Sequence, residues 1–164
     1  MDWEKHTKIR ILSDFPNLFN QRANQERPEN LLIHIHGGGF ISMSSGSHQN
    51  YTRLWAKLMP KTVLCSLDYR LAPESRFPAQ LDDCWQAYYW LVLNCEKVFG
   101  FNPKKIILVG DSAGGNLILS LTVMAIERGF RKPDGIVPCY AATLCSDQEF
   151  FPSLLFSVDD CILT

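Results

Sequence analysis

Short apolar runs alternate with longer segments of helical periodicity along most of this chain, and this alternation limits the fold more strongly than any other feature. The runs have the length of buried strands, whereas apolar residues spaced three and four apart indicate amphipathic helices. Strands are expected at 31–36, 62–67, 105–109 and 135–140, and helices at 49–59, 79–99 and 113–128. Right-handed crossovers join strands that alternate with helices. The sequence therefore predicts an α/β fold, a mostly parallel sheet with helices on both faces.

Composition and charge exclude several classes of protein. The 164 residues suffice for one domain, and 46% hydrophobic with 20% charged residues is typical of a globular protein. The formal net charge is -1 and no segment concentrates positive charge, so we expect no nucleic-acid partner. No apolar run could span a bilayer and the amino terminus has no apolar signal core, so we expect no transmembrane segment and an intracellular, cytoplasmic location. The six cysteines form no Cys-x-x-Cys pair, which predicts reduced packing thiols and no metal site.

The two ends of the chain differ from the regular middle. Residues 1–30 are expected to form a lead-in arm, in which the alternation at 7–12 is compatible with a short edge strand. The regular pattern begins at residue 31, and the chain stops where another strand–helix unit would be expected. The strand at 135–140 would then lie on an open edge of the sheet, where a partner chain can pair with it.

A Gly-x-Ser-x-Gly pentapeptide, residues 110–114, joins a predicted strand to the helix that follows it. A serine in this position sits on a tight, strained turn that exposes its hydroxyl above the sheet. Glycine at 110 and 114 relieves clashes with neighbouring backbone, and the amide of Ala113 at a helix amino end can stabilise negative charge. The pattern predicts an exposed nucleophile at Ser112, the alternative being a plain glycine turn into a helix.

A second glycine-rich segment, His36-Gly-Gly-Gly39, follows the first predicted strand of the alternating part. Consecutive glycines allow close approach of the backbone to a ligand and can aim amide donors at an oxyanion. The glycine spacings of nucleotide-binding loops are absent from the sequence. Two glycine segments at the carboxyl ends of two parallel strands indicate a ligand site at that edge.

Charged residues follow the next strand in a turn that contains proline. Asp68, Arg70 and Glu74 have the chemistry for catalysis. Charged side chains in such turns more often hold loops together, so we expect a structural role for these three.

Three segments in order resemble the signatures of the hormone-sensitive lipase group of esterases, in the α/β-hydrolase superfamily. They are His36-Gly-Gly-Gly39, Asp68-Tyr-Arg-Leu-Ala-Pro-Glu74 and Gly110-Asp-Ser-Ala-Gly-Gly-Asn116. The resemblance covers residues 31–164 and is to the amino-terminal part of that group's catalytic domain. It implies an α/β-hydrolase fold truncated before the last strands, with 1–30 as the lead-in arm and 31–164 as a partial catalytic domain.

The resemblance also implies a reaction, which is hydrolysis of a carboxylic ester through an acyl-serine intermediate. The substrate would be an acyl-ester small molecule or a lipid, and the serine mechanism needs no cofactor. Ser112 would be the nucleophile, and Gly37, Gly38 and the amide of Ala113 would form the oxyanion hole. The residues that support these motifs would be His36, Gly39, Gly110, Asp111 and Gly114. Association with lipid droplets or a membrane surface is a further expectation from the family.

The remainder of a catalytic triad is not identified in this sequence. In this fold the acid and the histidine follow the serine along the chain, yet all four histidines, at positions 6, 34, 36 and 48, precede Ser112. His34 and His36 are expected to be structural hydrogen-bonding residues, and His48 is a conceivable substitute base. Asp134 precedes its predicted strand and so would lie at the wrong end of the sheet.

Three hypotheses follow from the missing base. In the first, the chain is the amino-terminal part of a serine esterase or lipase domain that obtains its acid and histidine from beyond residue 164. Alternatively, it is a non-catalytic binding or assembly module that retains the hydrolase scaffold. The third hypothesis is that a partner chain contributes the histidine.

Overall fold

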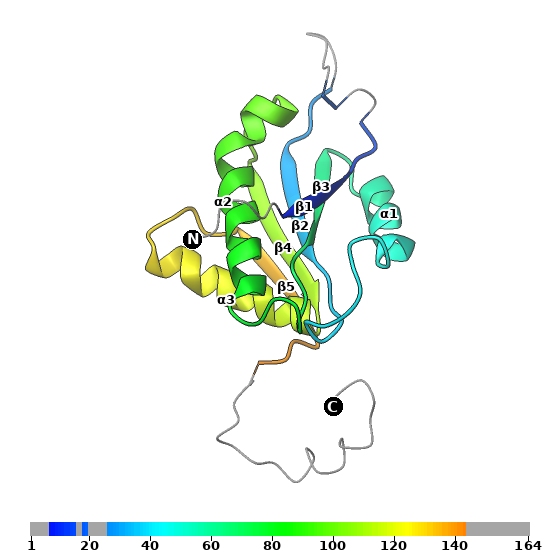
Figure 1. Cartoon of the computed structure of the whole chain (residues 1–164). Coiled ribbons are helices and arrows are strands. Elements are labelled where there is room, and N and C mark those ends of the chain that lie inside the picture. Colours follow the sequence, from blue (N-terminus) through cyan, green and yellow to red (C-terminus); the bar gives the residue numbers. More distant parts are fainter. Residues whose placement is uncertain (1–6, 16–17, 20–25, 144–164) are drawn as a thin grey trace.

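Strands and helices alternate along the chain in a computed structural model that describes residues 7–15, 18–19 and 26–143 (Figure 1). The elements in order are β1 (Lys8–Leu12), β2 (Asn30–Ile35), α1 (Gln49–Leu58), β3 (Thr62–Asp68), α2 (Ala79–Phe99), β4 (Lys105–Asp111), α3 (Ala113–Glu127) and β5 (Gly135–Cys139). Every strand and helix predicted from the periodicity is present, and the alternation at 7–12 forms β1. The predicted α/β fold is confirmed.

The strands form one sheet in the order β1-β3-β2-β4-β5. The pairs β2–β3, β2–β4 and β4–β5 are parallel, and β1 runs antiparallel to β3 at the edge. Ile33 of β2 is opposite Cys65 of β3 and Leu108 of β4, which places these residues in the middle of the sheet. The connections through helices bring the carboxyl ends of β2, β3, β4 and β5 to the same edge.

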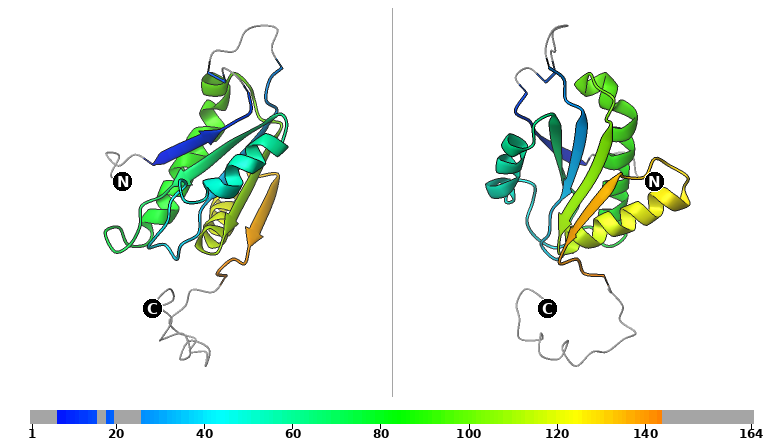
Figure 2. Two further views of the ribbon diagram at one scale, coloured as in Figure 1. Left: turned by 90° about the vertical axis from the view of Figure 1, so that its right-hand side faces the viewer. Right: turned by 180° about the vertical axis from the view of Figure 1, so that it is seen from behind.

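Helices cover both faces of the sheet, as the parallel arrangement requires. Figure 2 shows α2 and α3 on one face and α1 on the other. Alternate residues of β2 divide between the two sides: Leu31, Ile33 and Ile35 belong to the larger core with α2 and α3, whereas Leu32 packs near Trp55 of α1. The larger core contains the fully buried Tyr88, Leu91, Ile118 and Leu121 from the two helices.

Three cysteines lie inside this core. Cys65, Cys84 and Cys95 are buried and unpaired, and burial raises the pKa of each thiol, that of Cys95 to about 12. A thiol in such surroundings stays protonated and packs as a small apolar group. The predicted packing role is confirmed for these three, whereas Cys145 and Cys161 lie outside the described residues.

β5 has a neighbour on one side only among the described residues. The residues Ile136 and Val137 of this strand are 38% and 48% exposed, although both are apolar. An apolar edge strand with unpaired backbone groups can accept a further strand. This part of the chain therefore has the open edge that the sequence predicts.

An ion pair anchors the segment that follows β3. The Arg70 guanidinium donates to both carboxylate oxygens of Asp83 on α2, at 2.7–3.0 Å, and the backbone N–H of Arg70 donates to the same carboxylate at 2.8 Å. Asp68 accepts hydrogen bonds from the N–H and the hydroxyl of Ser45. These contacts agree with the structural role expected for Asp68 and Arg70, while Glu74 is exposed.

We predict that Asp83→Ala destabilises the fold by about 3 kcal/mol, because it leaves the Arg70 guanidinium and N–H without their buried acceptor. Urea unfolding followed by far-ultraviolet circular dichroism measures this loss. The matched control is Asp82→Ala, in the first turn of the same helix, which removes only a favourable charge at a helix amino end and should cost less than about 1 kcal/mol. Equal losses in the two variants would contradict the anchoring role of Asp83.

Candidate active site

Ser112 occupies the turn between β4 and α3 with a backbone conformation that is rare for serine. Its φ is 51° and its ψ is -116°, so the residue lies in the region that normally favours glycine. Its N–H donates to the Cys139 carbonyl at 2.9 Å, and its carbonyl accepts from the Asn116 N–H at 3.1 Å. The side chain is half-buried and makes no capping hydrogen bond to α3. The surrounding hydrogen bonds therefore hold a strained serine whose hydroxyl is not used by the helix.

Close packing of backbone explains the glycines on either side of this serine. A Cβ on Gly114 would overlap the carbonyl oxygens of Ile35 and His36, at the end of β2. A Cβ on Gly110 would lie 2.5 Å from the Gly114 carbonyl oxygen. The amino end of α3 thus rests directly on the end of β2, which is possible only without side chains at these two positions.

The glycine loop that follows β2 lies against the same turn. The Gly37 N–H donates to the Asp111 Oδ1 at 3.2 Å, and Gly38 has a φ of 110° and accepts from the N–H groups of Ile41 and Ser42. The Gly37 amide, which the family resemblance assigns to the oxyanion hole, is thus bound to a carboxylate in this structure.

Three other backbone amides beside the turn are available. Among residues 7–15, 18–19 and 26–143, the N–H groups of Gly38, Gly39 and Ala113 donate to no other group. Ala113 is at the first position of α3, where a backbone N–H has no partner within the helix. Amides of this kind can bind an oxygen that carries negative charge.

His34 and His36 are held by neighbouring groups at the ends of the parallel strands. His34 Nδ1 lies 2.7 Å from the Ser66 hydroxyl and its Nε2 lies 3.0 Å from the Tyr51 hydroxyl. The His36 Nδ1 donates to the Gly37 carbonyl at 2.7 Å, and its ring stacks on Tyr69 with centroids 4.2 Å apart. Burial lowers the pKa of both rings, that of His34 to about 4. These contacts agree with structural roles.

His48 faces a carboxylate. Its Nε2 lies 3.5 Å from the Asp111 Oδ2, and Asp111 also accepts from the hydroxyls of Tyr51 at 3.3 Å and Tyr140 at 3.4 Å. In the part of the chain described here, no hydrogen bond joins a histidine to the Ser112 hydroxyl. Neither tyrosine is predicted from the sequence, although Tyr140 directly follows a strand at the site edge and Tyr51 lies in the first turn of α1.

The acidic candidates downstream of Ser112 do not complete a triad in this structure. The Asp134 carboxylate accepts from the Ile106 N–H at 2.8 Å, near the amino ends of β4 and β5, which confirms the expected position at the opposite end of the sheet. The other downstream acids, Asp147, Glu149, Asp159 and Asp160, lie outside the described residues.

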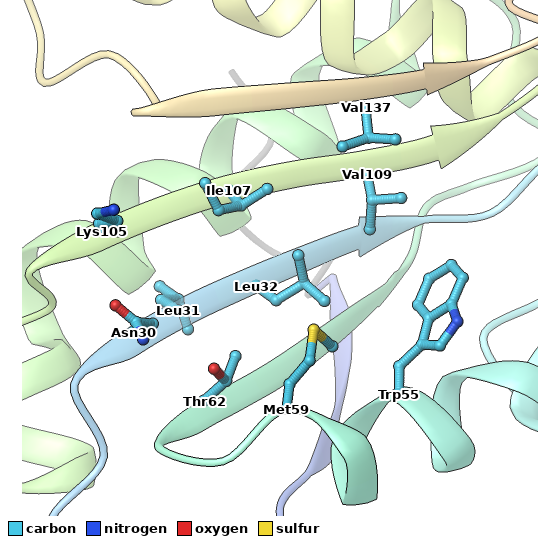
Figure 3. Close-up of a pocket in the computed structure, with 10 residues that line it drawn as sticks. All are labelled: Asn30, Leu31, Leu32, Trp55, Met59, Thr62, Lys105, Ile107, Val109 and Val137. Carbon is cyan, nitrogen blue, oxygen red and sulfur yellow. The ribbon is translucent and has the colours of Figure 1, made fainter.

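An apolar groove of about 380 Å³ lies on the α1 face of the sheet, and Ser112 is not among its lining residues (Figure 3). Figure 3 shows Trp55 and Met59 beside Leu32 and Val109, with Val137 of the edge strand on the far side. Its polar lining residues, Asn30, Thr62 and Lys105, lie at the amino ends of β2, β3 and β4. The groove is an incompletely covered sheet face and contributes no group to the serine site.

The described residues contain neither a metal-binding cluster nor a membrane-spanning helix. Within the described ranges, no group of histidine, cysteine, aspartate and glutamate side chains could hold a metal ion. None of the helices described is both long enough and apolar enough to cross a membrane.

Comparisons with known proteins identify relatives. A protein family described as alpha/beta hydrolase fold matches residues 32–159. Hormone-sensitive lipase of Bos taurus is 43% identical over 143 residues, which are 87% of this chain and 18% of that protein. Esterase LipU of Mycobacterium tuberculosis is 35% identical over 75% of this chain and 41% of its own length. A solved Pyrobaculum calidifontis esterase has a TM-score of 0.70 at 34% identity, covering 83% of this chain and 41% of its own. The chain thus spans less than half of each relative.

We predict that the free energy of unfolding falls as pH is lowered from about 6.5 to about 4. In this range unfolded His34 binds a proton whereas the buried ring stays neutral, so protons favour the unfolded state. Stability from this residue is complete above pH 6.5, and up to about 3 kcal/mol is lost at pH 4.

His34→Gln, which cannot titrate but can contact Ser66 and Tyr51, should lose this part of the pH dependence. Urea unfolding at pH 7.5, 6 and 4.5 compares the two proteins. If both lose the same stability across the range, folded His34 binds protons as readily as the unfolded residue and the prediction is wrong.

Proposed function

The chain belongs to the α/β-hydrolase family, in its hormone-sensitive lipase group, and from this membership we propose that it is part of a serine hydrolase that cleaves carboxylic esters. The observation that carries the proposal is the strained backbone of Ser112 at the junction of β4 and α3, next to three unused amides. Strain of this kind persists where the surroundings enforce it, and it is characteristic of the nucleophile turn in this fold.

The proposed reaction has two steps. The Ser112 Oγ attacks the carbonyl carbon of the ester while a base takes its proton, and the carbonyl oxygen becomes an oxyanion. Collapse of this intermediate breaks the bond to the alcohol oxygen, which leaves with the proton, and an acyl-serine remains. Water then attacks the acyl-serine with the same base, releasing the carboxylic acid and restoring the serine hydroxyl.

We assign the oxyanion contacts to the amides of Gly38, Gly39 and Ala113. Each is unused within the described residues, whereas the amide of Gly37 is bound to Asp111. The set therefore keeps Gly38 and Ala113 from the sequence prediction and replaces Gly37 by Gly39. Fixed amides of this kind stabilise charge where it develops, without reorganisation during the reaction.

We propose that the acid and the histidine of the triad come from outside these 164 residues. The support is the chain order of the triad in this fold together with the engagement of His34, His36 and His48 with other groups. The coverage of only 18% of the bovine lipase agrees with this arrangement. A histidine contributed by a partner chain at the open edge of the sheet would serve the same purpose.

The substrate class follows from the relatives and remains a proposal. The matched proteins are a lipase and esterases by name, so we infer an acyl ester, either a small molecule or a lipid. Ester hydrolysis by serine requires no cofactor. Association with a lipid droplet or membrane surface would suit a lipid ester, since such a substrate resides at an interface.

A second candidate function is a non-catalytic assembly module. One observation favours it: the three described histidines all contact groups other than Ser112. Such a module would keep the turn and the glycine loop as scaffold. The two candidates differ in one property, the reactivity of Ser112.

We predict that a fluorophosphonate labels Ser112 in the purified 164-residue chain, slowly alone and faster with added imidazole. An oxyanion site retains part of its effect without the triad base, and imidazole supplies the missing base. Mass mapping after digestion locates the label. Ser112→Ala should lose it, whereas Ser120→Ala in the same helix should keep it.

The outcomes separate the candidate functions. Label confined to Ser112 and accelerated by imidazole supports the hydrolase. A folded chain whose Ser112 stays unlabelled at every imidazole concentration overturns the catalytic proposal and favours the assembly module.

A further inference from the structure

Asp111 connects three segments that are far apart in the sequence. Its carboxylate accepts from the Gly37 N–H in the glycine loop, from the Tyr51 hydroxyl of α1 and from the Tyr140 hydroxyl after β5. Its side chain is 19% exposed, so these contacts are partly shielded from water. Asp111 also directly precedes Ser112 in the chain, which places this junction at the proposed nucleophile.

The glycine loop is fitted to this carboxylate. A Cβ added to Gly37 would overlap the Asp111 Oδ2, so residue 37 approaches the carboxylate more closely than any side chain would permit. The next two residues of the loop, Gly38 and Gly39, carry the unused amides proposed for the oxyanion. The contact between Gly37 and Asp111 therefore fixes the distance between these amides and the serine turn.

His48, the residue before α1, also faces the Asp111 carboxylate. Its Nδ1 lies 3.1 Å from the Ser44 carbonyl, which can only accept, and 3.2 Å from the Ser47 hydroxyl, whose own hydrogen goes to Ser44. These contacts hold the ring with its Nε2 3.5 Å from the Asp111 Oδ2.

Other titratable groups also surround the Asp111 carboxylate. Burial lowers the pKa of His34 from β2, to about 4, and also that of His36 from the glycine loop. The phenols of Tyr51 and Tyr140 have raised pKa values, Tyr51 mainly through burial and Tyr140 mainly through the charge of Asp111. The remaining groups near the cluster are Asp68, which is held by Ser45, and Cys139.

We propose that Asp111 is a positioning residue that holds the glycine loop against the Ser112 turn. This inference rests on the proposed function for its catalytic consequence, but the loop contact can be measured without catalysis.

Amide hydrogen exchange of the full chain tests the positioning role. Asp111→Ala should speed exchange of the Gly37 N–H by roughly tenfold or more, since that amide loses a charged acceptor. Asp111→Asn keeps an acceptor oxygen and should keep the protection. The Arg70 N–H, bound to Asp83, is an internal reference that should not change.

Asp134→Ala is the matched control at the other end of the sheet. It also removes a carboxylate that accepts from a backbone amide, that of Ile106, so it should release Ile106 and leave Gly37 protected. Fluorophosphonate labelling of Ser112 should slow by up to about 100-fold in Asp111→Ala and stay unchanged in Asp134→Ala. A general loss of stability would slow labelling in both variants.

Gly37 exchange in Asp111→Ala that stays within twofold of the wild type overturns the inference. If Ser112 is never labelled, the proposed function fails, while the exchange results still decide the role of Asp111.

Discussion

The parallel pairing of β2 with β4 is the constraint on which the rest of the site depends. Ile35 is opposite Gly110 in this pairing, so the two strands end side by side. The chain leaves β2 into the glycine loop and leaves β4 into the serine turn, and the loops therefore meet at one edge of the sheet. The bare backbone of Gly114 then allows α3 to begin directly against the end of β2.

Much of this arrangement could be predicted from the sequence because it depends on periodicity and on glycine. The strands and helices follow from the spacing of apolar residues, and the serine turn follows from Gly110 and Gly114. The position of β1 required more than local pattern, because its neighbour is β3 and not the next strand along the chain. A short alternating run contains no information about which edge of the sheet it joins.

The polar contacts of the site were less predictable, since they depend on where individual side chains point. Gly37, Gly38 and Gly39 are consecutive, so the sequence does not show which of their amides is free to bind an oxyanion. Only the direction of the Asp111 carboxylate distinguishes Gly37 from the other two. Tyr51 and Tyr140 reach Asp111 from elements separated by most of the chain. No spacing rule connects residues that meet only after the sheet has formed.

The hydrogen bond from the Ser112 N–H to the Cys139 carbonyl has a consequence beyond holding the turn. It joins the strained serine to the last residue of β5, and the exposed flank of β5 is where another strand can be added. The acceptor that holds the serine backbone in its rare conformation therefore belongs to the strand at the open edge of the sheet. A strand added at that edge would extend the same hydrogen-bonded sheet that supports the serine turn.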